Sequence, residues 1–127
     1  MWFHPPVSGQ FVLFAGLYES WRNPADGEWL RTFTILTTEA NAMVESVHNR
    51  MPVLLPRERL DEWLFVPPEE KERAVYAKDL RPLLAPAPLD ALIATEVSMR
   101  VNSVKNDDAA CLAPAHDREA ATAPRLL

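Results

Sequence analysis

Two short stretches of the sequence carry the side chains best suited to proton transfer. FAGLYESWRNP (residues 14–24) places Glu19 inside an otherwise apolar and aromatic run, and VHNRMPVLLP (residues 47–56) contains His48. A carboxylate in a partly dry, aromatic setting has a raised pKa, and a histidine titrates near neutral pH without help. If the two stretches meet in space, Glu19 and His48 form a general acid–base pair.

Two further residues of these stretches have the chemistry to bind DNA. Arg50 can hold a DNA phosphate, or the Glu19 carboxylate, through two hydrogen bonds, and Trp21 offers a flat surface for an unpaired base. Each candidate also has a plain structural interpretation. Glu19 can face solvent on a strand, His48 can close a helix, Trp21 can anchor the core, and Arg50 can be a surface or ion-paired residue.

Composition limits the class of protein. The 127 residues, 48% hydrophobic and 24% charged, fit one globular domain with a core. A formal net charge of -5 excludes a uniformly basic nucleic-acid-binding surface but does not exclude a local basic patch. Cys111 is the single cysteine, which excludes an internal disulfide and predicts a cytoplasmic protein. No metal and no cofactor are expected, because no ligand spacing, P-loop or dinucleotide fingerprint occurs.

Neither a membrane segment nor a signal peptide is visible. No apolar run approaches the ~20 residues that span a bilayer. The start, MWFHPPVSG, lacks a basic segment followed by a long apolar one. We therefore expect no membrane partner.

Periodicity predicts a mixture of strands and short helices. Strands are predicted over 10–18 and 30–38, paired through a loop at 23–29, over 51–56 and over 94–104, with residues 2–3 in an N-terminal hairpin. Helices are predicted over 37–47 with Thr38 as the cap, over 57–64, and as one or two short helices within 67–86. We expect the strand near 97–104 to pair with the sheet that carries 10–18 or 30–36. The polar, proline-broken segment 108–127 is predicted to be a flexible tail.

Several segments together resemble one known family. Four segments are similar to those of the SOS response-associated peptidase (SRAP) family, also called abasic-site processing proteins, and occur in the same order. These segments are FAGLYESW, TFTILTTEANAMV, VHNRMPVLLP and VSMRVNSVKND. The resemblance covers nearly all of residues 1–107. It implies an α+β fold, with an antiparallel sheet curled into a barrel-like core and short helices outside. It also implies that Glu19 and His48 are catalytic and that single-stranded DNA with an abasic site is the partner.

The chemistry that the resemblance implies depends on a residue that this sequence lacks. In the family, the amine and thiol of an N-terminal cysteine, in a Met-Cys-Gly-Arg start, attack the aldehyde of an abasic site, and a Schiff base closes to a thiazolidine. This chain begins Met1-Trp2-Phe3, and Cys111 matches no family position. We therefore expect residues 1–107 to be the C-terminal part of an SRAP domain and the chain to be inactive as given. A truncated gene, a misassigned start or a separately encoded first half would each explain this.

Three functions remain open from the sequence. One is a DNA-damage-response protein with the family's DNA crosslinking and its peptidase- or lyase-like activity. Another is a pseudo-enzyme fragment that binds DNA or a partner without covalent chemistry. The last is a structural or interaction module unrelated to DNA. A missing first half would leave open sheet edges, which predicts self-association.

Overall fold

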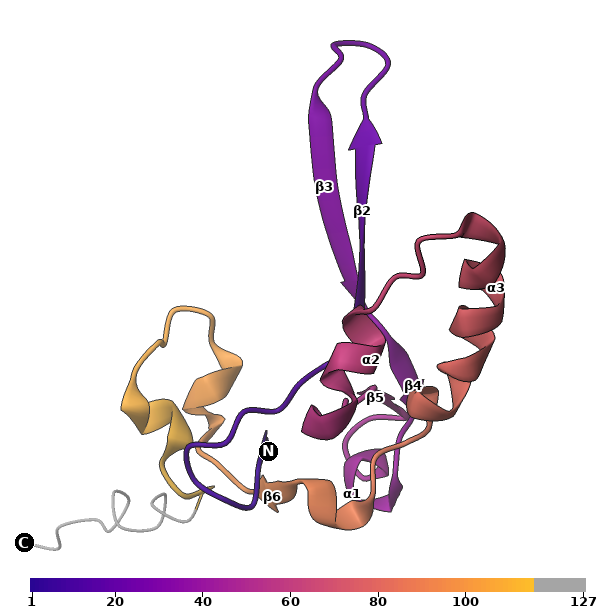
Figure 1. Ribbon diagram of the computed structural model, residues 1–127. Coiled ribbons are helices and arrows are strands. Elements are labelled where there is room, and N and C mark those ends of the chain that lie inside the picture. Colours follow the sequence, from indigo (N-terminus) through magenta and orange to yellow (C-terminus); the bar gives the residue numbers. More distant parts are fainter. Residues whose placement is uncertain (116–127) are drawn as a thin grey trace, which may run out of the picture. The chain divides into compact units, whose positions relative to one another are not determined.

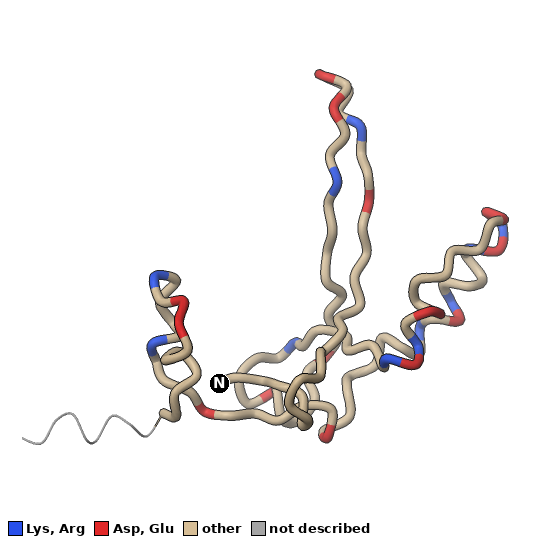
Figure 2. The backbone as a smooth tube through the Cα atoms, turned by 60° about the vertical axis from the view of Figure 1, so that its left-hand side comes forward, with Lys and Arg blue, Asp and Glu red and all other residues tan. Residues whose placement is uncertain are grey.

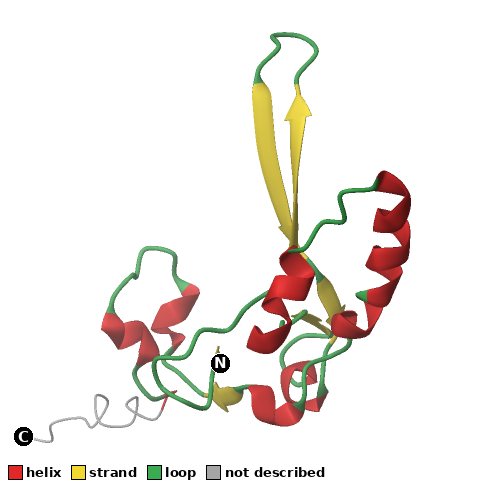
Figure 3. Ribbon diagram, viewed as in Figure 1, coloured by secondary structure: helices red, strands yellow, loops and turns green. Residues whose placement is uncertain are grey.

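The computed structural model describes residues 1–115, and these form two compact units. One unit contains residues 9–89, and the other contains residues 1–8 together with residues 90–115. The strands are β1 (Trp2–His4), β2 (Gly16–Arg22), β3 (Trp29–Ile35), β4 (Thr37–Glu39), β5 (Arg50–Pro52) and β6 (Ile93–Thr95) (Figures 1 and 3). The α-helices are α1 (Ala42–Glu45), α2 (Leu60–Leu64) and α3 (Glu70–Asp79). The 3-10 helices are η1 (Arg57–Arg59), η2 (Arg81–Leu84), η3 (Leu89–Ala91), η4 (Met99–Asn102) and η5 (Ala109–Leu112).

The core of unit 9–89 lies where three extended segments meet. Backbone hydrogen bonds of 2.9 Å run from Ala15 N to Val53 O, from Val53 N to Leu36 O and from Leu36 N to Ala15 O. Ala15 and Val53 are almost fully buried and form one cluster with Leu55 and Leu83. Half-buried side chains pack against this cluster: Leu13, Leu36, Trp63, Leu80 and Leu84. The apolar run predicted as a buried strand over 51–56 therefore does supply core residues, although β5 itself covers only its beginning.

The predicted pairing of the first two long strands is confirmed, in the form of the hairpin β2–β3. Its register runs from Gly16 opposite Ile35 to Arg22 opposite Trp29. Gly27 turns the chain with φ +76°, and its N–H donates to the carbonyl of Asn23 at 2.8 Å. Glycine suits this position because positive φ carries no steric cost without a Cβ atom.

The stretch 14–24, which reads as core in the sequence, is largely exposed. Every residue of β2 except Gly16 is exposed, and so is every residue of β3. The reason is that β2 and β3 pair only with each other among the described residues, and no layer covers either face. The partly dry setting that the sequence indicated for Glu19 is therefore absent in this chain.

The helices predicted over 57–64 and within 67–86 are confirmed, and they cover the core. Trp63 of α2 donates its indole N–H to Gly16 O at 3.3 Å, which ties α2 to the start of the hairpin. Tyr76 of α3 donates its hydroxyl to Glu62 O at 2.7 Å and packs edge-on against Phe65. Figure 2 shows charges along α3, and none of the residues of this helix is buried.

The helix predicted over 37–47 is wrong in its first half. Residues 37–39 form β4, which pairs with β5, and α1 begins only at Ala42. The cap is Asn41 and not Thr38: its side-chain oxygen accepts a hydrogen bond from Val44 N at 3.1 Å. The β-branched threonines of β4 find a partner strand, and this tertiary pairing outweighs the local helical periodicity.

The other unit contradicts two further predictions. β1 pairs with β6, so residues 2–3 form no hairpin with the strand that follows Gly9. The strand predicted over 94–104 ends at Thr95, and residues 99–102 form η4. Ser98 starts that turn by accepting a hydrogen bond from Arg100 N at 3.2 Å, which competes with an extended strand.

No closed barrel occurs within residues 1–115, although the α+β class is confirmed. The described strands form three separate two-stranded antiparallel sheets. A barrel needs continuous strand pairing around its whole circumference, which these sheets do not supply. The division at residues 107/108 stays a prediction, as does the flexible tail: η5 lies in the described part of 108–127, and residues 116–127 lie outside the description.

Candidate functional site

His48 lies in the turn between α1 and β5, where the end of the short helix places it. Its backbone N–H donates to Val44 O at 2.9 Å. Its ring atom Nδ1 lies 3.0 Å from both the backbone nitrogen and the carbonyl oxygen of Arg50. A neutral ring can accept from that N–H, and a ring protonated at Nδ1 can donate to that carbonyl. Either way Nδ1 is occupied, and Nε2 of this exposed residue makes no hydrogen bond within the described chain.

Arg50 is held along β4 by one threonine. Its Nη2 donates to the carbonyl oxygen of Thr37 at 2.6 Å and to the Thr37 hydroxyl at 2.9 Å, and Nε lies 3.3 Å from the same hydroxyl. These contacts fix one side of the guanidinium, while the residue as a whole is exposed. A positioned arginine of this kind binds a phosphate with less loss of side-chain freedom.

Glu19 and Trp21 share one face of the hairpin. They are two residues apart on β2, opposite Thr32 and Leu30 respectively, and side chains at that spacing point to the same side of a sheet. Both side chains are exposed, and 52% of Trp21 is accessible to solvent. The core-anchor interpretation of Trp21 therefore does not hold in this chain, whereas Trp63 does pack against the core.

The candidate residues belong to one unit but come from two places in it. No hydrogen bond or ion pair joins Glu19 to His48 within residues 1–115. The hairpin β2–β3 extends from the core, whereas α1 and β5 lie at its base (Figure 1). The arginine contacts Thr37 and not the Glu19 carboxylate. That Glu19 and His48 act as a joined pair stays a prediction.

Thr37 and Asn41 are the positioning residues that sequence reasoning missed. Asn41 caps α1 and also donates its side-chain N–H to Ala87 O at 3.0 Å, which fixes the start of the segment that ends in His48. An asparagine three residues before Val44 is a strong local signal for a helix cap. Thr37 had no such signal, because its contact with Arg50 depends on the pairing of β4 with β5.

Residues 1–115 contain neither a metal-binding cluster nor a membrane-spanning helix. No group of three or more His, Cys, Asp or Glu side chains is arranged to hold a metal ion there. None of the helices in that range is both long and apolar enough to cross a bilayer.

Comparisons with known proteins identify relatives over most of the chain. The family model described as SOS response associated peptidase (SRAP) matches residues 1–104. Abasic site processing protein YoqW of Bacillus subtilis is 41% identical over 100 residues, which cover 79% of this chain and 42% of YoqW. Abasic site processing protein HMCES of Gallus gallus is 34% identical over 106 residues, which cover 83% of this chain and 29% of HMCES.

A solved structure shows the same fold. The crystal structure of a protein from Bacteroides thetaiotaomicron aligns with a TM-score of 0.68 and 24% sequence identity, covering 89% of this chain and 47% of that one. The chain therefore spans less than half the length of YoqW and of this structural neighbour.

Proposed function

Because the chain belongs to the SOS response associated peptidase (SRAP) family, we propose that it takes part in the processing of abasic sites in DNA. The family match over residues 1–104 carries the proposal, and that range includes all four candidate site residues. Relatives named abasic site processing proteins support it. Since the chain spans 42% of YoqW, the substrate and reaction of the whole relatives belong to this proposal alone.

His48 is the proton-transfer group at the base of the site. With Nδ1 held by the Arg50 backbone, Nε2 is the ring atom that can take a proton from the substrate or give one to it. Arg50, held by Thr37, binds a phosphate next to the lesion. Because His48 and Arg50 are two positions apart in the sequence, one segment carries both the proton-transfer group and the phosphate-binding group.

Glu19 and Trp21 act from the hairpin. An abasic nucleotide interrupts base stacking, and an adjacent unpaired base can stack on the exposed indole of Trp21. Glu19, on the same face, is then the second acid–base group. Bound DNA would exclude water from the carboxylate, which is exposed in the unbound chain.

The 127-residue polypeptide should bind this DNA without covalent chemistry. A thiazolidine needs an amine and a thiol on one residue, and Cys111 is the single cysteine. Its backbone nitrogen is an amide that donates to Asp108 O at 3.0 Å, so it cannot form a Schiff base. This observation favours the second candidate function, a module that binds DNA or a partner without covalent chemistry.

The test is binding to a single-stranded oligonucleotide that contains one abasic site, measured over a range of salt concentrations. We expect affinity to fall with salt, with a log–log slope of about -0.7 for each phosphate contact. Arg50→Gln should flatten the slope by about one such contact. Arg57→Gln, which removes an exposed arginine outside the site, is the matched control and should leave the slope unchanged. Binding that is absent, or insensitive to salt, contradicts the proposal.

A denaturing gel without reductant tests the covalent step. We expect no retarded band, because a lysine imine hydrolyses. A band that disappears in Cys111→Ala would identify Cys111 as a nucleophile and contradict the expectation. A band that persists in that variant would indicate an imine at a lysine or at the N-terminal amine, and with it a lyase-like reaction.

A further inference from the structure

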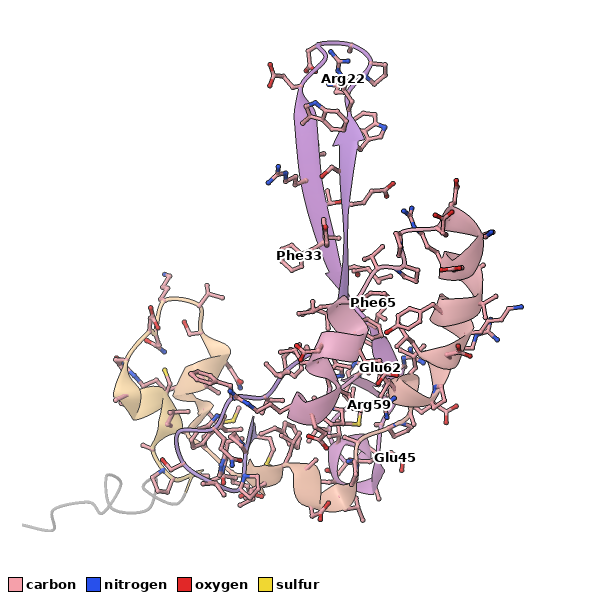
Figure 4. The ribbon with its side chains drawn as sticks, viewed as in Figure 1. Arg22, Phe33, Glu45, Arg59, Glu62 and Phe65 are labelled. Atoms are coloured by element: carbon pink, nitrogen blue, oxygen red, sulfur yellow. The ribbon has the colours of Figure 1, made fainter. Side chains whose placement is uncertain are left out.

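The helix α3 and the connection that leads into it from α2 line a cavity in unit 9–89. The cavity has a volume of about 500 Å³. Its apolar lining comes from Phe65 and Pro67 of the connection and from Val75 and Tyr76 of α3. Phe65 follows the last residue of α2 (Figure 4), and its ring meets that of Tyr76 edge-on, with ring centroids 5.3 Å apart. None of the four candidate site residues lines this cavity, so it is separate from the site described above.

Hydrogen bonds hold the two walls of the cavity together. Arg73 of α3 donates from Nε to Pro67 O at 3.0 Å and from Nη2 to Pro68 O at 3.3 Å. The hydroxyl of Tyr76 ties α3 to α2 through its hydrogen bond to Glu62 O. The two prolines also fix φ in the connection. The walls are therefore formed in advance, and a ligand that enters loses little affinity to ordering them.

The apolar lining of the cavity is only partly covered. Pro67 is buried, whereas 53% of Phe65 and 60% of Val75 are exposed. The helix α3 contributes no buried residue at all. A cavity of this volume, lined mainly by apolar and aromatic side chains with a few charged groups, is typical of a binding site.

Two carboxylates lie on either side of the apolar part of α3. Glu72 and Asp79 both line the cavity and are seven positions apart, which is about 10.5 Å along a helix. Neither forms an ion pair within residues 1–115. Lys71 also lines the cavity, so two carboxylates and one ammonium group leave the lining with an excess of negative charge. A ligand of this cavity should therefore be apolar in its middle and basic at its ends.

We propose that this cavity is a docking site for an extended peptide segment of another protein, with two Arg or Lys side chains three positions apart and apolar residues between them. An extended chain advances about 3.3 Å per residue, so three positions span about 10 Å and match the spacing of the two carboxylates. The apolar residues of the peptide pack on Val75 and on the Phe65–Tyr76 pair, as proline-containing segments do in aromatic-lined grooves.

Charge argues against a second copy of this chain as the occupant. The chain carries a formal net charge of -5, and the cavity itself has more carboxylates than ammonium groups. Like charges across an interface are unfavourable, whereas a basic segment is attracted to this surface.

The experiment uses the full 127-residue chain and a fluorescent, end-blocked peptide with the sequence Gly-Arg-Pro-Leu-Arg-Gly. We expect saturable binding in a fluorescence anisotropy titration, with a Kd below about 1 mM, and amide chemical-shift changes confined to residues 65–79. The peptide Gly-Glu-Pro-Leu-Glu-Gly, in which both arginines are replaced by glutamate, should not bind. Absence of saturable binding up to about 1 mM, or equal binding of the two peptides, overturns the proposal.

A pair of matched double variants tests the two carboxylates. Glu72→Gln with Asp79→Asn should weaken binding of the arginine peptide about fivefold, because each exposed ion pair contributes up to about 1 kcal/mol. Asp61→Asn with Glu70→Gln removes the same charge from two exposed residues outside the lining and should change the Kd by less than about twofold. Circular dichroism checks that each variant folds. Equal effects of the two double variants would show attraction to the net charge alone and overturn the proposal.

The apolar part of the cavity has its own test. Val75→Thr replaces one methyl group of the lining by a hydroxyl and should weaken binding about threefold. Ala77→Ser, a similar change at an exposed residue of α3 outside the lining, is the control and should have no effect. A chain that is dimeric by light scattering and becomes monomeric in Val75→Thr identifies a second copy as the occupant and overturns the proposal. No DNA is present, so these outcomes are independent of the proposed abasic-site function.

Discussion

Ala15 and Tyr18 lie three residues apart in one extended segment, yet Ala15 is fully buried and Tyr18 is 83% exposed. At Ala15 the backbone pairs on two sides, with Leu36 and Val53, and the helices α2 and η2 cover the result. At Tyr18 one strand pairs on one side and nothing covers the face. Apolar residues alone therefore do not make a core. Ala15 has a third extended segment and a covering layer, and Tyr18 has neither.

The largest expected effect comes from removing a core side chain. Leu55→Ala takes a buried residue out of the cluster that contains Ala15, Val53 and Leu83. We expect the free energy of unfolding to fall by about 2–5 kcal/mol, because lost apolar burial and a cavity add together. Urea denaturation followed by tryptophan fluorescence measures it. A loss under about 1 kcal/mol would mean that the cluster is not the stabilising core of this unit.

A smaller effect is expected at the junction between the two regions. Trp63→Phe keeps an aromatic ring against the core but removes the N–H donor to Gly16 O. We expect a loss of about 1 kcal/mol, the typical net contribution of one hydrogen bond. Hydrogen exchange should rise mainly in β2 and β3. Uniformly faster exchange over the whole unit would show instead that the indole acts through packing.

The ion pair between η1 and α2 tests the covering layer through its dependence on pH. Arg59, the last residue of η1, is hydrogen-bonded to Glu62 of α2, the helix that covers the core (Figure 4). The hydrogen bond from Arg59 lowers the pKa of Glu62 below its usual 4.5. The stabilisation is therefore present above the unfolded pKa and is lost as pH falls through the lower folded pKa.

Glu62→Gln should lower the urea midpoint slightly at pH 7 and by a smaller amount at pH 3. Because both side chains are partly exposed, we expect a smaller change than for Trp63→Phe. Glu58→Gln, a neighbouring exposed acid on η1, is the control. An equal change at both pH values would mean that the charge of Glu62 contributes nothing.

The smallest effect is expected on the hairpin. Phe33→Thr replaces a residue that is 81% exposed and should change the free energy of unfolding of the isolated chain by less than about 0.5 kcal/mol. The same urea titration measures it beside Leu55→Ala. A loss comparable with that of Leu55→Ala would mean that Phe33 is buried in solution, which would remove the contrast between the two regions.

Local signals predicted well those features that depend on a few neighbouring residues. The pairing of two β-rich runs through the loop at 23–29 was predicted, as were the helices after Pro56 and Pro68, because turn residues and periodicity act over short distances. The predicted boundaries were wrong where pairing with a distant strand determined the structure. Residues 37–39 form β4 because they pair with β5, and Ile93–Thr95 form β6 because they pair with β1. Proline, capping and alternation contain no information about such partners.

For the candidate site, the sequence by itself determined which chemistry is present: a carboxylate, an imidazole, a guanidinium and an indole in two stretches similar to those of the SRAP family. Only the tertiary structure decided that Thr37 orients Arg50, that the Arg50 backbone occupies Nδ1 of His48, and that Glu19 and Trp21 share an exposed face. The physical reason is the distance along the chain over which each property is determined. Residue type fixes acidity and hydrogen-bonding capacity, whereas orientation and exposure depend on strands and layers contributed by residues far away in the chain.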